Sequence, residues 1–284
     1  MSLPWRRLLR RYVPDELRLR RVLARRALQD RRSHTRFACE YVGDSGFDHV
    51  IAEYAGPLIT YPGQENSAAA KRHNLTLAAA SMDGVLIHSG EVFAMWRLIG
   101  RPGQREGYLP GAAIRDGLLE IEAGGSICLL STVLYNIALL GGMSIVERHN
   151  HSIDLYGPSR YFELGRDATV EYGYLDLRFA NPHAFPVVLR AACQADSVVC
   201  RLLAPQPAPF TIEIRVDEPA IIPAPVIASG VAPNPYMPEG REGLRIEARR
   251  IWHTAEGDRI EPLPSTYHRP VPGTGVRATE EVRA

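Results

Sequence analysis

A cysteine placed to act as a nucleophile stands at the start of a strongly apolar segment in the middle of the chain. Gly124, Gly125 and Ser126 precede it, Cys128 is the cysteine, and residues 129–140 are almost entirely apolar. This order is typical of a glycine turn that leads into a buried helix, with Ser126 as the N-cap. A thiol in the first turn lies beside unpaired backbone N–H groups and the positive end of the helix dipole, which both favour the thiolate.

Two histidines follow this predicted helix at the spacing of a strand. A glycine pair ends the apolar run, and residues 144–152 then alternate in polarity, which places His149 and His151 on one strand face. Two imidazoles on one face suit a base for the thiol, or two ligands of one zinc ion with Cys128 or Asp167 as a third. Because an H-x-H pair alone is a weak metal signal, we predict no metal and no cofactor.

A carboxylate that would orient an imidazole comes later in the chain, as Asp167 or Asp176. Cysteine at a helix start, histidine on a strand and then an acid is the order found in papain-like and transglutaminase-like cysteine enzymes. The predicted catalytic group is therefore Cys128 with His149, His151 and Asp167. Its chemistry would be acyl transfer or amide hydrolysis, with the Cys128 amide as one oxyanion donor.

A binding module without catalysis is the alternative from a different class. Its groove would be shaped by the glycine-rich loop over residues 100–111 and by the glycines before the cysteine, and it would hold a peptide or glycan fragment. The predicted substrate-binding residues are Arg148, Arg166, Tyr108, Gly124 and Gly125. In the binding module the contacts would be Tyr108, Trp96 and Tyr135, with Arg148 or Arg166 holding a carboxylate. The simplest interpretation of Cys128 is that it is a small buried apolar residue with no catalytic role. The sequence leaves open whether the protein is an enzyme.

Charge is distributed unevenly along the chain. The 284 residues carry a net charge of +1, but residues 1–36 hold 12 arginines against three acidic residues, so the remainder is mildly acidic. The basic arm would either pack its apolar face on the body or make a weak contact with an anionic membrane surface. Nucleic acid is not an expected partner, because the arm lacks interleaved aromatic residues. The oligomeric state is not predicted.

Cysteine usage and hydropathy indicate the cellular location that we expect. The four cysteines, at positions 39, 128, 193 and 200, show no metal-finger spacing. No apolar run approaches the roughly 20 residues of a membrane span, and the start of the chain lacks the apolar core of a signal peptide. We therefore expect reduced thiols and a cytoplasmic protein, with peripheral contact to the inner face of the membrane as an option.

The pattern of elements predicts an α+β protein with a mainly β C-terminal half. Two helices are predicted over residues 5–32, the second beginning at Pro14, and another over 67–82. Strands are predicted over 85–87, 91–98, 112–115, 165–179, 186–193, 198–203 and 210–216. A final hairpin is predicted over 244–268, with its turn at Glu256 and Gly257. Three regions result: a basic helical arm (1–36), a central domain with the cysteine helix buried against a mainly antiparallel sheet (37–204), and a proline-rich link with a small β extension (205–284).

Six motifs, in order, resemble those of the VanW family, bacterial proteins named from vancomycin-resistance gene clusters. They are KRHNLTLAAASMDG, SGEVFAMW, REGYLPG, GGSICLLSTVLYN, VERHNHSIDLY and GRDATVEYGYLDLRFAN, and the resemblance covers about residues 30–204. It implies a link to glycopeptide resistance or cell-envelope metabolism rather than a defined reaction. Under that association, the expected substrate is a small-molecule or peptide-like envelope precursor.

The family motifs place functional residues position by position. The glycine turn and cysteine fall on Gly124, Gly125 and Cys128, the Glu-Arg-His-x-His-Ser run on residues 147–152, and the Gly-Arg-Asp-Ala run on residues 165–168. Two positions depart from the pattern. Ser126 stands where the family usually has a third glycine, and Leu129 stands where it usually has a glutamine, so an activity that needs this glutamine would be missing here.

Overall fold

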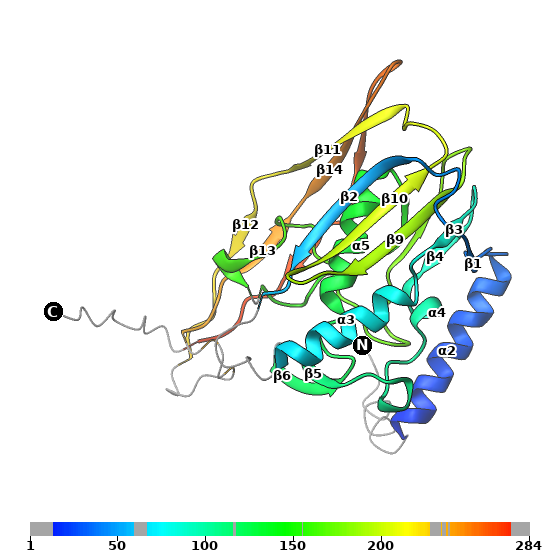
Figure 1. Cartoon of the computed structure of the whole chain (residues 1–284). Coiled ribbons are helices and arrows are strands. Elements are labelled where there is room, and N and C mark those ends of the chain that lie inside the picture. The colour runs from blue at the N-terminus through cyan, green and yellow to red at the C-terminus, as the bar shows by residue number, and fades with distance from the viewer. Residues whose placement is uncertain are drawn as a thin grey trace.

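The chain folds into helices and antiparallel sheets, which confirms the α+β class (Figure 1). The structure is a computed structural model, and it describes residues 14–59, 67–115, 118–154, 156–227, 234, 237 and 239–273. The first helix predicted within the arm lies outside these residues, as does most of the proline-rich link after residue 227.

The cysteine helix α5 (Cys128–Leu140) lies at the centre of the fold. Its side chains from Leu129 to Leu139 are all buried, as expected of a helix that is apolar on nearly every face. It packs on β2 (His49–Pro57) and β10 (Ser197–Ala204), which lie in front of it in Figure 1. The approach is close, because a Cβ added at Gly56 would meet Val133 Cγ2 at 2.7 Å.

A five-stranded antiparallel sheet forms the platform for this helix. Its strand order is β1-β3-β9-β10-β2, with β1 at Glu40–Tyr41, β3 at Val85–Ile87 and β9 at Val187–Cys193. Helix α3 (Ala68–Ala80) packs against β9 and α5. The predicted helix over 67–82, the strand over 85–87 and the hairpin formed by β9 and β10 are therefore confirmed.

Two smaller sheets lie near the ends of α5. One has the order β4-β8-β7, with β4 at Val92–Ala94, β8 at Arg178–Ala180 and β7 at Ser144–Glu147. The other is the hairpin of β5 (Pro110–Arg115) and β6 (Leu118–Ala123), which leads into the glycine turn before Cys128. A short helix, α4 (Met95–Ile99), follows β4 directly, so the strand predicted over 91–98 is only half correct.

The C-terminal region forms two three-stranded sheets that pack back onto the centre of the molecule. Their orders are β11-β14-β15 and β12-β13-β16, with β11 at Phe210–Val216, β12 at Ala220–Ile222, β13 at Gly243–Ile246, β14 at Ala248–Thr254, β15 at Gly257–Pro262 and β16 at Thr266–His268. Ala248 and Leu263 belong to the same apolar core as α5. The buried Arg250 donates to the carbonyl oxygens of Leu139 (3.2 Å) and Met143 (2.8 Å). These bonds satisfy acceptors at the end of α5 and just beyond it.

Helix α2 (Asp15–Arg32) is the second arm helix, and it begins directly after Pro14 as predicted. Leu19 is buried against the body, and Arg26 donates to both carboxylate oxygens of Glu147 at 2.8 Å. A third contact joins Asp30 to Arg178 at 2.8 Å. The arm helix therefore packs its apolar face on the body, while a membrane contact through the arm stays a prediction.

Two predicted strands near the histidines are wrong in extent. The strand predicted over 144–152 ends at Glu147, and the strand predicted over 165–179 is replaced by single bridge pairs, such as His149 with Thr169, before β8 begins at Arg178. In this segment, backbone groups are hydrogen-bonded by side chains and not by the backbone of a neighbouring strand. For example, Ser131 donates to the Ala168 carbonyl at 2.7 Å.

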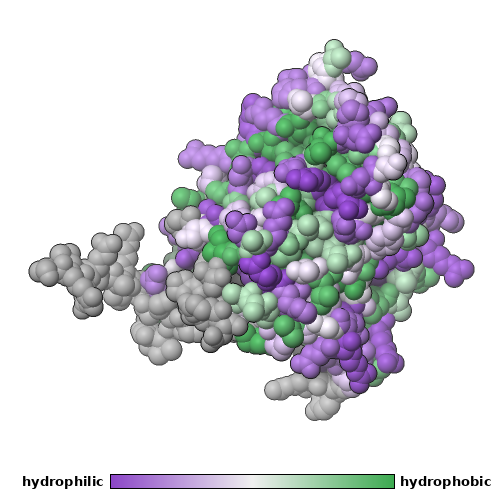
Figure 2. Space-filling model, viewed as in Figure 1, coloured by the Kyte–Doolittle hydropathy of each residue, from purple (hydrophilic) through white to green (hydrophobic). Residues whose placement is uncertain are grey.

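The surface and the cysteines give two further observations. Figure 2 shows polar and apolar residues interspersed over the face of the molecule seen in Figure 1. Across the described ranges, no helix combines the length and the apolar character that crossing a bilayer requires. All four cysteines lie within those ranges, and each is a free thiol.

Gly142 tests how tightly the end of α5 packs on the C-terminal sheets. It has a positive φ of 68°, and an added Cβ would meet Trp252 Cη2 at 2.5 Å. Gly100 has a similar φ of 74° but nothing within 4 Å of an added Cβ. We expect Gly142→Ala to lower the free energy of unfolding by about 2–4 kcal/mol and Gly100→Ala by about 1 kcal/mol, because only Gly142 adds a clash with a packed ring to the backbone strain. Urea denaturation measures both; equal losses would show that the ring moves freely.

Candidate functional site

Cys128 is the first residue of α5, at the end of a tight turn. Gly124 and Ser126 both have positive φ, of 80° and 77°. The predicted N-cap role of Ser126 is wrong: the N-cap is Ile127, which makes no side-chain capping bond. Because Ser126 has a left-handed backbone that favours glycine, the third glycine of the family pattern matches the conformation found here. The uncapped helix start leaves backbone N–H groups near the thiol.

Cys128 is a half-buried residue. Its sulfur lies 3.4 Å from the Thr169 hydroxyl and 3.8 Å from the Val170 carbonyl oxygen. Both partners belong to the segment that follows Asp167, so this segment forms one wall beside the sulfur.

His151 is the histidine that lies next to this thiol. Its side chain is 8% exposed, and its Nδ1 lies 2.8 Å from Asp167 Oδ2. The His151 backbone N–H donates to the same oxygen, also at 2.8 Å. With Nδ1 bonded to the carboxylate, Nε2 is the nitrogen left to interact with Cys128. The structure thus brings together a thiol, an imidazole and a carboxylate in the order of a cysteine-enzyme triad.

The protonation states in this group follow from mutual pairing. Burial alone would raise the pKa of the Cys128 thiol, but the hydrogen bond and charge of His151 bring this pKa below its usual value. Burial alone would lower the pKa of His151, but Asp167 and Cys128 raise it to about 10. Burial would also raise the pKa of the Asp167 carboxyl, yet His151 and Arg148 hold that pKa well below its usual range. Mutual pairing thus opposes the effect of burial and favours the thiolate–imidazolium form of the pair.

Arg148 holds Asp167 from the other side instead of facing a ligand. Its side chain is 1% exposed, and its Nη2 donates to Asp167 Oδ1 at 3.0 Å. It also donates to the carbonyl oxygens of Gly165 and Asp167 and to the Thr266 hydroxyl at 2.8 Å. Its guanidinium lies 5.0 Å from the centre of the Tyr135 ring. The predicted role of Arg148 in holding a substrate carboxylate is therefore not supported by its position.

Strand β16 supplies two partners that the sequence analysis missed. The buried His268 lies with its Nδ1 2.9 Å from the His151 carbonyl oxygen and its Nε2 4.0 Å from Asp167 Oδ1. Thr266 accepts from Arg148, as described above. These residues are 117 and 118 positions from their partners. No local pattern in the sequence could have linked them to the histidine motif.

His149 pairs with a different carboxylate from His151. Its side chain is 37% exposed, and its Nε2 lies 3.0 Å from Glu147 Oε1. The expectation that both imidazoles lie on one strand face is wrong, because the strand ends at Glu147, before either histidine. Within the described residues, no group of three or more His, Cys, Asp or Glu side chains is arranged to hold a metal ion.

The other predicted contacts are also occupied within the fold. Arg166 is buried and donates to Asn136 Oδ1 at 2.6 Å, and the Tyr108 side chain is buried, as are Gly124 and Gly125. Asp176 accepts from the Trp96 amide at 3.2 Å and from Arg178 at 2.9 Å. Asp176 therefore belongs to a different cluster, and Asp167 is the carboxylate beside His151.

Aromatic side chains near His151 were also missed. Tyr156 meets the His151 ring edge-on at 6.3 Å between ring centres, and it also contacts Tyr161 and Phe162 at 5.2 and 5.7 Å. Their closeness in sequence to the histidine motif was the available signal. They give the site an apolar side.

Leu129 stands where the family pattern has a glutamine, and its surroundings show what this position contacts. Its side chain is buried, and a Cβ added at Gly56 of β2 would meet Leu129 Cδ1 at 2.9 Å. Position 129 thus faces the five-stranded sheet. Replacing a glutamine by leucine here adds to the packing of α5 and removes no polar group from the wall formed by Thr169 and Val170.

Comparisons with known proteins match the central part of the chain. A family model described as "VanW like protein" matches residues 70–203. The uncharacterized protein YoaR of Bacillus subtilis is 30% identical over 154 residues, which cover 54% of this chain and 49% of YoaR. The vancomycin B-type resistance protein VanW of Enterococcus faecalis is 34% identical over 142 residues, which cover 50% of this chain and 46% of that protein. No solved structure matches the chain.

The chain spans about half the length of the curated relatives that it matches. Cys128, His151 and Asp167 all fall within the matched residues, whereas α2 and β16 fall outside them. Residues 70–203 therefore form a region that is similar to the VanW family, and both relatives support the same likeness.

Proposed function

We propose that this VanW-like protein is a cysteine-dependent enzyme that transfers or hydrolyses an acyl group. Cys128 is the proposed nucleophile, His151 the general acid and base, and Asp167 the group that orients the imidazole. The observation that supports this proposal is the 2.8 Å contact between His151 Nδ1 and a fully buried Asp167 carboxylate, beside the half-buried residue Cys128.

The proposed reaction uses the ion pair directly. The Cys128 thiolate attacks the carbonyl carbon of an amide, and the resulting oxyanion accepts from the backbone N–H of Cys128 at the start of α5. The His151 imidazolium then gives its Nε2 proton to the leaving amine as the C–N bond breaks, which leaves a thioester on Cys128. Water or an acceptor amine, deprotonated by the now neutral His151, attacks the thioester and releases the thiolate.

A peptide-like precursor of the cell envelope is the proposed substrate class. One relative is named as a vancomycin resistance protein, which suggests an envelope context, and a thiolate–imidazolium pair suits amide bonds. The proposed location is the cytoplasm, peripheral to the inner face of the membrane. A binding module without catalysis has less support, because the predicted ligand contacts Arg148 and Arg166 are engaged within the fold.

Alkylation tests whether Cys128 is an activated thiol. At pH 7 an ordinary thiol is only a few per cent thiolate, so we expect iodoacetamide to modify Cys128 roughly 10-fold faster than the exposed Cys39, after allowing for the lower nucleophilicity of a low-pKa thiolate. Cys200 is buried, and burial raises its pKa, so it should react only in urea. Mass spectrometry of tryptic peptides gives the rate at each cysteine. If Cys128 also reacts only in urea, the proposed nucleophile is wrong.

The two neighbouring histidines provide a matched pair of variants. In wild type the thiol pKa is lowered by His151, so the Cys128 alkylation rate should already be high at neutral pH. In His151→Gln the imidazolium is lost and burial raises the thiol pKa, so the rate at pH 7 should fall about 10-fold or more and recover only above about pH 9. His149→Gln should keep the wild-type profile, because His149 pairs with Glu147. A shift in the His149 variant alone would contradict this assignment; circular dichroism checks that both variants fold.

A further inference from the structure

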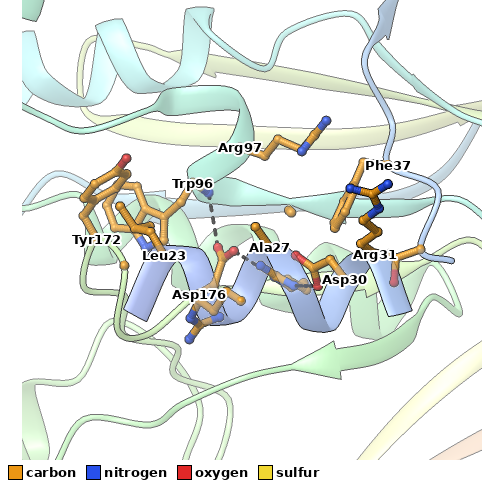
Figure 3. A pocket seen from close by; sticks show the side chains of 14 residues that line it. Leu23, Ala27, Asp30, Arg31, Phe37, Trp96, Arg97, Tyr172 and Asp176 are labelled. Atoms are coloured by element: carbon orange, nitrogen blue, oxygen red, sulfur yellow. Dashed lines mark hydrogen bonds and ion pairs between the residues drawn. The ribbon is translucent and has the colours of Figure 1, made fainter. Parts of the chain in front are cut away.

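A cavity lies between α2 and the body, and none of Cys128, His151 or Asp167 lines it (Figure 3). Its volume is about 390 Å³, which is enough for a small organic molecule. Helix α2 forms one side, and α4 with the segment around Tyr172 forms the other. The family model does not extend to α2, so this cavity is formed partly by residues outside the matched range.

One part of the cavity offers flat apolar surfaces. Trp96 and Tyr172 meet edge-on with 5.7 Å between ring centres, and Leu23 of α2 lies nearby in the lining. The indole is fixed, because Trp96 Nε1 donates to the Leu175 carbonyl oxygen at 2.7 Å. A planar ring could pack here without ordering a mobile side chain.

The other part of the cavity is positively charged. Two of its four arginines are neutralised within the fold: Arg26 by Glu147, and Arg178 by Asp30 and Asp176. The other two are Arg31 and Arg97. Within the described ranges, neither makes an ion pair with a carboxylate, and Arg97 stacks over the Phe37 ring at 4.7 Å. Figure 3 shows Arg31, Arg97 and Phe37 toward one end of the cavity and Trp96 with Tyr172 toward the other.

We propose that this cavity binds a small organic anion that carries a planar ring. The ring packs against Trp96 and Tyr172, and a phosphate or carboxylate group pairs with Arg31 and Arg97. Asp30 and Asp176 share Arg178, so together with Arg26 and Glu147 they leave one negative charge, which the two positive charges of Arg31 and Arg97 outweigh. This site is separate from the proposed enzyme site and does not depend on it.

Calorimetric titration of the full chain with 1-naphthyl phosphate tests the proposal. Inorganic phosphate tests the anion without the ring, 1-naphthalenemethanol tests the ring without the anion, and 1-naphthoate tests carboxylate against phosphate. We expect 1-naphthyl phosphate, 1-naphthoate or both to bind at least 10-fold more tightly than inorganic phosphate and the neutral alcohol, because only a molecule with both groups uses both ends of the cavity. Absence of binding by both naphthyl anions at about 1 mM would overturn the proposal.

Variants with the same loss of charge locate the binding. The double variant Arg31→Gln with Arg97→Gln should weaken binding of the naphthyl anion at least 10-fold. The control is Arg21→Gln with Arg25→Gln, two exposed arginines of α2 that do not line the cavity, and it should bind as wild type does. Equal weakening in both double variants would mean that the anion responds only to net charge, and the site would be rejected.

Discussion

The buried carboxylate of Asp167 requires the rest of this region to be arranged around it. A fully buried anion is costly unless it is paired and hydrogen-bonded, and Asp167 receives the Arg148 guanidinium, the His151 imidazole and the His151 amide. Cys128 completes the group, and pairing with His151 lowers the pKa of its thiol below the usual value although burial opposes this shift. Pairing of opposite charges therefore lets these ionisable side chains share one largely buried place.

The C-terminal strands take part in this arrangement although they lie beyond the family match. Thr266 and His268 of β16 hold Arg148 and the His151 carbonyl, and Arg250 of β14 satisfies backbone acceptors at the end of α5. The cysteine helix is therefore fixed at its start through the charged group and at its end through Arg250. In this chain, residues within the family match are positioned partly by residues outside it.

Sequence reasoning predicted the parts of this molecule that local pattern controls. The apolar run and the glycines that bound it predicted α5, and alternation with turn residues predicted β3, β9, β10 and β11. It failed where side chains bond to the backbone across the fold. The strand predicted through His151 stops at Glu147, because the His151 amide donates to Asp167 and not to a neighbouring strand. For the same reason the pattern could not tell His149 from His151, or reveal that Arg148 is buried.

The two histidines of the motif pair with different carboxylates, His149 with Glu147 and His151 with Asp167. Because Glu147 also binds Arg26, the motif is connected to the arm helix α2. Burial alone would raise the pKa of Glu147, but His149 and Arg26 lower it to about 2, so it stays charged and holds both. Asp167 takes His151 in the same way. His151 pairs with Asp167 beside the thiol, whereas His149 pairs with Glu147, which also binds Arg26 of α2. A family motif of six residues thus serves two structural purposes at once, because the carboxylate partner of each histidine, and not strand periodicity, decides where its side chain lies.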